Sequence, residues 1–317
     1  MKLGEPFKPM DPVLISGIFD DNDWAYQVKW DGVRILAHLT NGGVRLFNKR
    51  MNERTGQYPE LLPLVKNSIR AGEAILDGEV IALRKGKPNF YDVIRRDWAQ
   101  NDFSIKTLQR ELPVNYMLFD IIYLDGQDLR ALPWEERQAQ LSQNVLESDR
   151  LVITDTVDGK GTALFQSVKQ HKLEGVVAKK RSSRYILGGK NKLWKKAKVW
   201  KKIDCAIGGY TLSDKQLGAF LLGGYLEGHF YYIGKVNAAF KAEEQKKLKT
   251  YLESIIRYDC PFANMPKFSG TVLWVKPELV LLVEFLEWTD DFKLRHPKIL
   301  GFSEVASRDC RLAIVPD

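Results

Sequence analysis

The chain of 317 residues carries a formal net charge of +8, with 44% hydrophobic and 28% charged residues. This composition is typical of a folded globular protein and excludes a disordered or fibrous chain. No apolar run reaches the roughly 20 residues that span a bilayer, so we expect no membrane segment. The length suffices for two domains, each with a core of its own.

The cysteines and the first residues indicate a reducing cellular setting. Cys205, Cys260 and Cys310 are odd in number and far apart, which disfavours a disulfide framework or a structural zinc site. Residues 1–12 combine prolines with mixed charge, whereas a secretory signal has a basic stub followed by an apolar core. We therefore expect a cytoplasmic protein.

The first predicted strand carries a lysine of special interest. After an extended lead-in over residues 1–23, apolar and polar side chains alternate from Trp24 to Asp31, which is the period of a half-buried strand. The apolar side faces the core, and Lys29 points the opposite way, towards a cleft. The Asp-Gly pair that follows predicts a hairpin, in which Arg34 begins a second strand beside the first.

Lys29 could act as a nucleophile towards phosphorus if its surroundings free the amine. A pocket that disfavours charge or adds cationic neighbours lowers the pKa of a lysine in this way. The alternative is an ordinary surface turn with a solvated lysine, which is the commoner fate of such a hairpin.

The next residues predict a mixed α and β region up to about residue 200. Helices are expected at 59–69, 132–146 and 162–171, and further strands at 44–47, 74–83, 114–124, 174–179 and 193–200. After residue 200, short strands at 203–210, 218–226, 230–236 and 279–286 surround one amphipathic helix at 242–255. Short strands with one helix predict an oligonucleotide-binding (OB) barrel, although a generic β-domain fits equally well.

All of the excess positive charge lies in residues 179–202, which hold eleven Lys and Arg residues and no acid. A solvated charge run is the usual interpretation of such a stretch. However, Tyr185, Trp194 and Trp200 are interleaved with the lysines, which indicates a folded segment. A folded basic stretch with aromatic side chains suits a polyphosphate or a nucleic-acid backbone.

Several residues could serve a phosphoryl-attacking lysine. Glu79, beside a glycine, could accept hydrogen bonds from ribose hydroxyls, and Phe119 could stack on a base. Glu174 begins an apolar strand and could hold a divalent cation, while Lys196 and Lys198 project from one strand face towards phosphates. Taken singly, each residue is a weak signal. Glu79 is more often a turn carboxylate and Phe119 a core aromatic, while Glu174 could be an ordinary strand-end acid and the two lysines a solvated strand face.

The order and combination of these stretches resemble the nucleotidyltransferase motifs of the covalent ATP-dependent ligase superfamily. The motifs are Lys29-x-Asp-Gly-x-Arg34, Asp77-Gly-Glu79, Phe119-Asp120, Glu174-Gly-Val-Val-x-Lys179 and Lys196-x-Lys198. Trp194-Lys-Lys-Ala-Lys198 and Leu294-Arg-His-Pro297 look most like the ligase domain of bacterial end-joining DNA ligases. The resemblance implies an α+β fold, with an adenylation domain of antiparallel sheets at 1–200 and an OB-fold β-barrel at 201–317.

The resemblance also implies roles for single residues. Lys29 would attack the α-phosphate of ATP and carry AMP as a phosphoramidate, before AMP passes to the 5′-phosphate of a nick and the 3′-hydroxyl displaces it. The nucleotide would be bound by Gln27, Val28, Arg34, Arg50, Glu79, Phe119, Lys196 and Lys198, and Mg²⁺, or Mn²⁺ in its place, by Glu174. Lys179, Arg184 and Arg295 would contact DNA.

The implied setting follows from the same resemblance. The partner would be nicked or broken duplex DNA, with a Ku-type end-binding protein as a candidate second partner. The protein would be a monomer in the bacterial cytoplasm, associated with the nucleoid.

Two stretches depart from the family pattern. Where Ser-Arg-x-Gly is usual, the chain reads Lys49-Arg50-Met51-Asn52, and asparagine tolerates the positive φ that glycine would adopt. The expected C-terminal Arg-x-Asp-Lys is not evident, so we expect self-adenylylation either to be slow or to use Arg295, and the sequence leaves open whether Arg308-Asp309 substitutes.

Three alternatives follow from these observations. An RNA ligase or a capping guanylyltransferase shares the same motifs, and a catalytically dead nucleic-acid clamp would explain the missing C-terminal element. An NAD-dependent ligase is disfavoured because its N-terminal domain and four-cysteine zinc module have no counterpart here.

Overall fold

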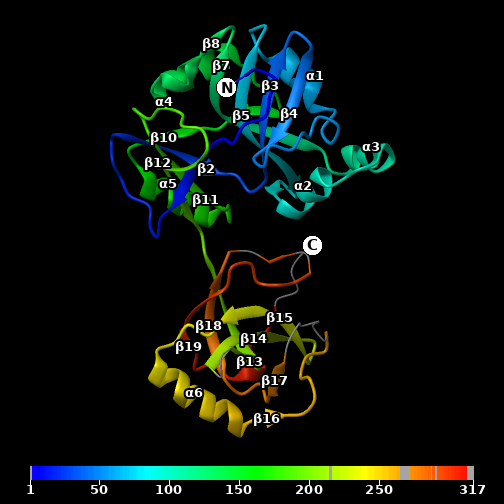
Figure 1. Ribbon diagram of the computed structural model, residues 1–317, viewed down its shortest axis with the longest axis vertical. Coiled ribbons are helices and arrows are strands. Elements are labelled where there is room, and N and C mark those ends of the chain that lie inside the picture. The colour runs from blue at the N-terminus through cyan, green and yellow to red at the C-terminus, as the bar shows by residue number, and fades with distance from the viewer. Residues whose placement is uncertain (1, 214–215, 265–270, 287, 290, 313–317) are drawn as a thin grey trace. The chain divides into compact units, whose positions relative to one another are not determined.

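The computed structural model describes residues 2–213, 216–264, 271–286, 288–289 and 291–312 (Figure 1). The chain divides into two compact units, Met1–Val199 and Trp200–Asp317. Among the described residues, no helix is long and apolar enough to cross a membrane.

Two sheets build the first unit. One has the order β1 (Met10–Leu14), β12 (Gly189–Lys198), β11 (Gly175–Lys180), β2 (Trp24–Lys29), β10 (Thr156–Asp158). The other has the order β4 (Gly43–Asn48), β3 (Val33–Thr40), β5 (Ala74–Arg84), β7 (Val114–Leu124), β8 (Gln127–Asp128), with β6 (Lys87–Pro88) beside β5 and β9 (Leu151–Ile153) beside β7. Most of these pairs are antiparallel, which confirms the predicted α+β class.

The helices of this unit are α1 (Leu61–Ser68), α2 (Phe90–Asp97), α3 (Asp102–Glu111), α4 (Trp134–Asn144) and α5 (Gly161–Gln170), with a short 3₁₀ turn, η1 (Leu129–Ala131). They cover these sheets, apart from α3, which packs beside α2 (Figure 1). The main core lies where α1, α2 and α4 bury Val65, Val93 and Leu141 against the second sheet. Each such side chain contributes about 1.5–3 kcal/mol by leaving water. The core therefore fixes the strands that carry the site.

The sequence interpretation missed β1, α2 and α3. Both helices begin at an asparagine whose side chain accepts a backbone hydrogen bond: Asn89 from Asp92, and Asn101 from Ser104. An asparagine before a helical pattern is an N-cap signal, so these two helices could have been predicted. β1 could not, because it pairs in parallel with β12 almost 180 residues away.

The predicted hairpin at Asp31-Gly32 is wrong. β2 pairs with β10 and β11 in the first sheet, whereas β3 pairs with β4 and β5 in the second. Gly32 passes the chain between the sheets so closely that an added Cβ would lie 2.2 Å from the Val80 carbonyl oxygen. The Asp-Gly signal is local, while the choice of strand partner depends on distant residues.

The second unit is built around a long strand, β13 (Lys201–Ser213). One edge pairs with β14 (Gln216–Leu226), which continues to β15 (His229–Asn237). The other edge pairs first with β18 (Val280–Phe285) and then with β17 (Val272–Val275), and β19 (Lys298–Phe302) and β16 (Ile256–Arg257) extend these two strands. One helix, α6 (Ala242–Ser254), and a short turn, η2 (Ser307–Asp309), complete the unit.

This arrangement is OB-like. Helix α6 buries Leu248 and Leu252 in the same core as Phe220 and Leu281 of the sheet. The strand pairs of the described residues do not close into a ring, so the structure supports an OB-like domain without showing the predicted closed barrel.

Candidate active site

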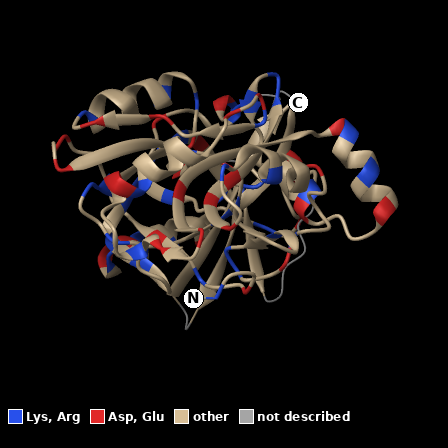
Figure 2. Cartoon of the chain, turned by 90° about the horizontal axis from the view of Figure 1, so that it is seen from above, with Lys and Arg blue, Asp and Glu red and all other residues tan. Residues whose placement is uncertain are grey.

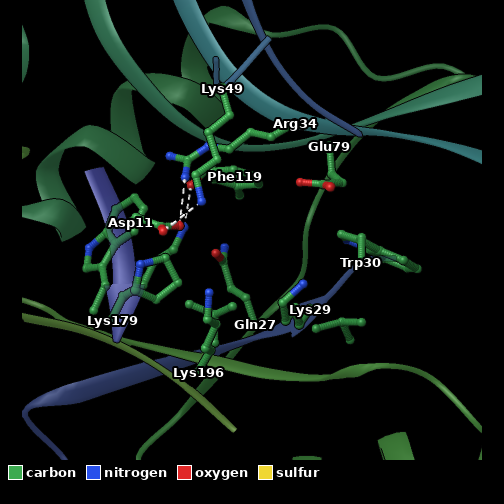
Figure 3. A pocket seen from close by; sticks show the side chains of 14 residues that line it. Asp11, Gln27, Lys29, Trp30, Arg34, Lys49, Glu79, Phe119, Lys179 and Lys196 are labelled. Carbon is green, nitrogen blue, oxygen red and sulfur yellow. Dashed lines mark hydrogen bonds and ion pairs between the residues drawn. The ribbon is translucent and has the colours of Figure 1, made fainter. Parts of the chain in front are cut away.

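A pocket lies between the two sheets of the first unit (Figure 3). Strands β1, β2, β11 and β12 supply one wall, and β3, β5 and β7 supply the other. Eight of the predicted site residues line it: Gln27, Val28, Lys29, Arg34, Glu79, Phe119, Lys179 and Lys196. The pocket therefore collects side chains from positions that are far apart in the sequence.

Lys29 is held by a carboxylate rather than left as a free amine. Its Nζ donates to one oxygen of Glu174, and the other oxygen accepts from Lys198 Nζ at 2.7 Å. Burial disfavours the charged form, but Glu174 and Glu79 outweigh it and raise the pKa of Lys29 above its usual value. The expected lowering of this pKa is wrong, because the nearest charged neighbours of Lys29 are anions and not cations.

Glu79 lies on β5 directly opposite Arg34 of β3. Burial raises the pKa of its carboxyl to about 7, while the nearby Lys29 and Arg34 act in the opposite direction. Near neutral pH the protonated and the ionised forms of Glu79 are therefore both populated. It can donate to or accept from a hydroxyl group of a bound ligand.

Replacing Glu79 with glutamine is expected to change the pH dependence of stability. Between pH 4.5 and about 7 the folded state retains a proton that the unfolded chain has released. The stability that this proton contributes therefore falls as the pH rises through that window. The melting temperature of Glu79→Gln should rise relative to the native protein, by several degrees, from about pH 5 to about pH 8. If the melting temperatures of the native protein and Glu79→Gln change with pH in parallel, the pKa of Glu79 is not raised in the folded protein.

Arg34 lines the pocket and is anchored by a buried carboxylate. Its guanidinium donates to both oxygens of Asp77, at 2.8 and 2.6 Å, and Tyr185 donates its hydroxyl to the same carboxylate at 2.5 Å. The guanidinium also lies 5.3 Å from the centre of the Phe119 ring. Arg34 therefore supports the predicted stacking ring, and its strongest contacts are already made within the protein.

Lys179 needs a correction, because its side chain is buried inside the pocket and not on an exposed DNA-binding surface. It is 2% exposed, and its Nζ donates to the Phe119 carbonyl oxygen at 2.9 Å. The Nζ lies 4.5 and 4.4 Å from the ring centres of Phe119 and Trp194. Burial lowers the pKa of Lys179 to about 7. A charge count along the sequence does not reveal that β11 is covered on both faces.

Gln27 brings an unsatisfied acceptor to the pocket. Its side chain is 1% exposed, and its Nε2 donates to the Thr154 carbonyl at 3.1 Å and to Thr156 Oγ1 at 3.2 Å. Within the described residues its Oε1 has no partner. A buried acceptor without a donor costs stability, so this position fits a ligand that donates, such as the exocyclic amine of a base.

The turn after β4 differs from its predicted arrangement. Arg50 is exposed and does not line the pocket, whereas its neighbour Lys49 does. The side chain of Asn48 accepts from the backbone of Arg50 at 2.9 Å and of Asn52 at 3.0 Å. The positive φ of 66° falls on Met51 and not on Asn52. The sequence interpretation missed Lys49 and also Asp11, which β1 brings to the same wall.

The remaining predicted DNA-binding residues lie outside the pocket. Arg184 is exposed between β11 and β12, and Arg295 belongs to the second unit, where its carbonyl oxygen accepts from Leu286 at 3.1 Å. Positive and negative residues are interspersed along the ribbon (Figure 2). Arg308-Asp309 forms the η2 turn, and residues 313–317 lie outside the described part.

The carboxylates of the pocket suit a cation that arrives with a ligand. In the described part of the chain, no group of three or more His, Cys, Asp or Glu residues could hold a metal ion. Mg²⁺ is commonly bound through one or two carboxylates together with substrate phosphates and waters. Glu79, which lines the pocket, and Glu174, which binds Lys29, fit this donor set.

The chain is similar to known proteins over both units. Residues 8–198 match a family model described as ATP dependent DNA ligase domain, and residues 213–305 match ATP dependent DNA ligase C terminal region. The multifunctional non-homologous end joining protein LigD of Mycolicibacterium smegmatis is 30% identical over 285 residues, which are 88% of this chain and 36% of that protein. The chain thus spans about a third of the length of this relative.

Two solved structures are similar across nearly the whole chain. The crystal structure of the ligase domain from M. tuberculosis LigD has a TM-score of 0.53 and 26% identity, covering 97% of this chain and 98% of that one. A mycobacterial DNA ligase D complexed with ATP and MES has a TM-score of 0.53 and 27% identity, covering 96% and 97%.

Proposed function

Because the chain belongs to the family of ATP-dependent DNA ligases, we propose that it seals breaks in duplex DNA that carry a 5′-phosphate and a 3′-hydroxyl. The observation that carries this proposal is the placement of Lys29, at the end of β2, in a pocket that Phe119 and Gln27 also line. The Gln27 Oε1 atom there has no hydrogen-bond donor among the described residues. An amine, a base platform and paired phosphate-binding lysines are what a covalent nucleotidyl transfer requires.

The reaction begins with Lys29 as the nucleophile. Its neutral Nζ attacks the α-phosphorus of ATP, the bond to the β-phosphate oxygen breaks, and pyrophosphate leaves. The carboxylate of Glu174 already accepts a hydrogen bond from this Nζ, so it is the nearest acceptor for the proton that the amine must lose. A 5′-phosphate oxygen of DNA then displaces Lys29 from AMP, and the 3′-hydroxyl finally displaces AMP from the DNA.

The other pocket residues bind and orient the nucleotide. We assign Phe119 to stacking on adenine, the Gln27 Oε1 atom to its exocyclic amine, and Glu79 to the ribose hydroxyls. Lys196 and Lys198 neutralise phosphate charge, as does Mg²⁺ when bound, with Glu174 as its ligand and Mn²⁺ as an alternative. Such groups stabilise charge that develops during transfer.

The cellular role that we propose is end-joining DNA repair in the bacterial cytoplasm, at the nucleoid. The names of the relatives support end joining, and a Ku-type end-binding protein is the candidate partner of a monomeric ligase. Arg184 and Arg295 remain the proposed DNA contacts. Since such lysine and arginine contacts release counterions, binding to DNA should weaken steeply with salt.

Incubating the native protein with α-labelled ATP and Mg²⁺, followed by nicked duplex DNA, tests the proposal. We expect label bound covalently to the protein and then a sealed strand. Faster labelling by GTP would indicate a capping enzyme, and preferential sealing of nicked RNA would indicate an RNA ligase. A protein that binds nicked DNA but takes up no label would be a nucleic-acid clamp, and the ligase proposal would be wrong.

A further inference from the structure

Asp11, which belongs to none of the motifs, forms an ion pair with Lys49 at the pocket (Figure 3). Asp11 Oδ2 lies 2.7 Å from Lys49 Nζ, and Asp11 Oδ1 lies 3.9 Å from an Nη atom of Arg34. The Asp11 side chain is 13% exposed and that of Lys49 45% exposed. The pair therefore spans from the pocket wall to its open side.

Separate elements hold the two ends of this pair. Asp11 sits on β1, which is fixed to β12 of the first sheet, and Lys49 sits in the turn after β4 of the second sheet. The side chain of Asn48 fixes that turn through two backbone hydrogen bonds. The ion pair thus joins the two walls of the pocket. Each partner also has a position fixed by its own strand or turn.

Other cations that line the pocket make different contacts. Arg34 is bound to Asp77, Lys29 to Glu174, and Lys179 lies beneath the Phe119 ring. Lys49 is also held by a carboxylate at the pocket, but its side chain is 45% exposed, compared with 21% for Lys29 and 9% for Arg34. A substrate phosphate that approaches Lys49 therefore meets an ammonium that the Asp11 carboxylate already binds.

We propose that Asp11 and Lys49 form a phosphate gate, in which Asp11 occupies Lys49 until a substrate phosphate displaces it. The proposal rests on the ligase function and adds a phosphate-binding residue to it. A phosphate group carries more charge than one carboxylate and offers three acceptor oxygens, so it competes well for the ammonium. The group is either a β- or γ-phosphate of ATP or the 5′-phosphate of the nick.

Three variants test the gate: Lys49→Gln, Asp11→Asn and the double variant. The KM for ATP is measured in the labelling reaction, and the KM for nicked DNA with protein that already carries AMP. Lys49→Gln should raise one of these KM values about tenfold, which corresponds to about 1.4 kcal/mol. Asp11→Asn should lower the same KM about threefold by removing the competitor, and should have no effect in the Lys49→Gln background.

The KM that moves identifies the phosphate, and kcat should change little. Glu53→Gln is the matched control, since it breaks a half-exposed ion pair with Arg45 of β4, and neither Glu53 nor Arg45 lines the pocket. An increase in KM on Asp11→Asn would show that Asp11 positions Lys49, and would overturn the gate. Unchanged KM values on Lys49→Gln would also overturn it.

The gate proposal can be tested separately from ligase activity, by measuring the binding of ATP. Trp30 and Trp194 line the pocket, so quenching of tryptophan fluorescence reports ATP binding even if the native protein takes up no label. Tenfold weaker binding of ATP by Lys49→Gln, with tighter binding by Asp11→Asn, would support the gate in an inactive protein. Equal affinities in all variants of such a protein would refute it.

Discussion

Replacing Lys29 with alanine is expected to abolish covalent labelling by α-labelled ATP and to slow ATP-dependent nick sealing by about 10⁴-fold or more. The reason is that Lys29 supplies the only bond through which AMP would be held between the two substrates. The measurement is the rate of label transfer to the protein, followed by the rate of strand joining.

A matched lysine and a bypass substrate make this result specific. Lys195 neighbours Lys196 on β12, but its Nζ packs 4.4 Å from the Trp24 ring and does not line the pocket. Lys195→Ala should keep its label. Lys29→Ala should still join DNA whose 5′-phosphate already carries AMP, because that step needs no amine. A labelled Lys29→Ala protein would show that the nucleophile lies elsewhere.

The pH dependence of labelling gives a second view of the same amine. Because Glu174 and Glu79 raise the pKa of Lys29, the neutral amine is scarce near pH 7 in the free protein. The labelling rate at saturating ATP should therefore rise with pH into the alkaline range. A rate that is flat from about pH 6 to 9 would mean that substrate binding releases the amine.

The residues of the site could be predicted where short sequence motifs contain them. Lys29, Glu79 and Phe119 come from three separate stretches, and the structure brings them into one pocket. Their order along the chain was informative because Lys29 ends a strand, Glu79 follows a glycine, and Phe119 precedes an aspartate in an apolar strand.

The parts that could not be predicted depend on distant pairing. Asp11 was interpreted as part of an extended lead-in, yet β1 joins β12 through register contacts such as Asp11 with Lys190. Lys179 was counted as surface charge because the sequence does not show that both faces of β11 are covered. The hairpin prediction was wrong for the same reason, since an Asp-Gly pair indicates a turn but does not determine which strands pair with each other.

Replacing Arg137 with methionine is expected to lower the free energy of unfolding of the first unit by about 3–5 kcal/mol. Arg137, on α4, donates to both oxygens of Asp120 at 2.8 and 2.9 Å, and the two side chains are fully buried. It also donates to the carbonyl oxygens of Leu132 and Ser183. Methionine fills much of the volume but leaves the Asp120 carboxylate without its counter-charge.

The consequence should reach the active site, because Asp120 lies opposite Asp77 on neighbouring strands and follows Phe119 directly. Thermal or urea unfolding measures the loss. Arg45→Ala breaks a half-exposed pair and should cost at most about 1 kcal/mol. Adding Asp120→Asn to Arg137→Met should restore part of the stability, since the uncompensated charge, and not the lost contact, carries most of the cost. A double variant no more stable than Arg137→Met would instead assign the cost to the lost hydrogen bonds around α4.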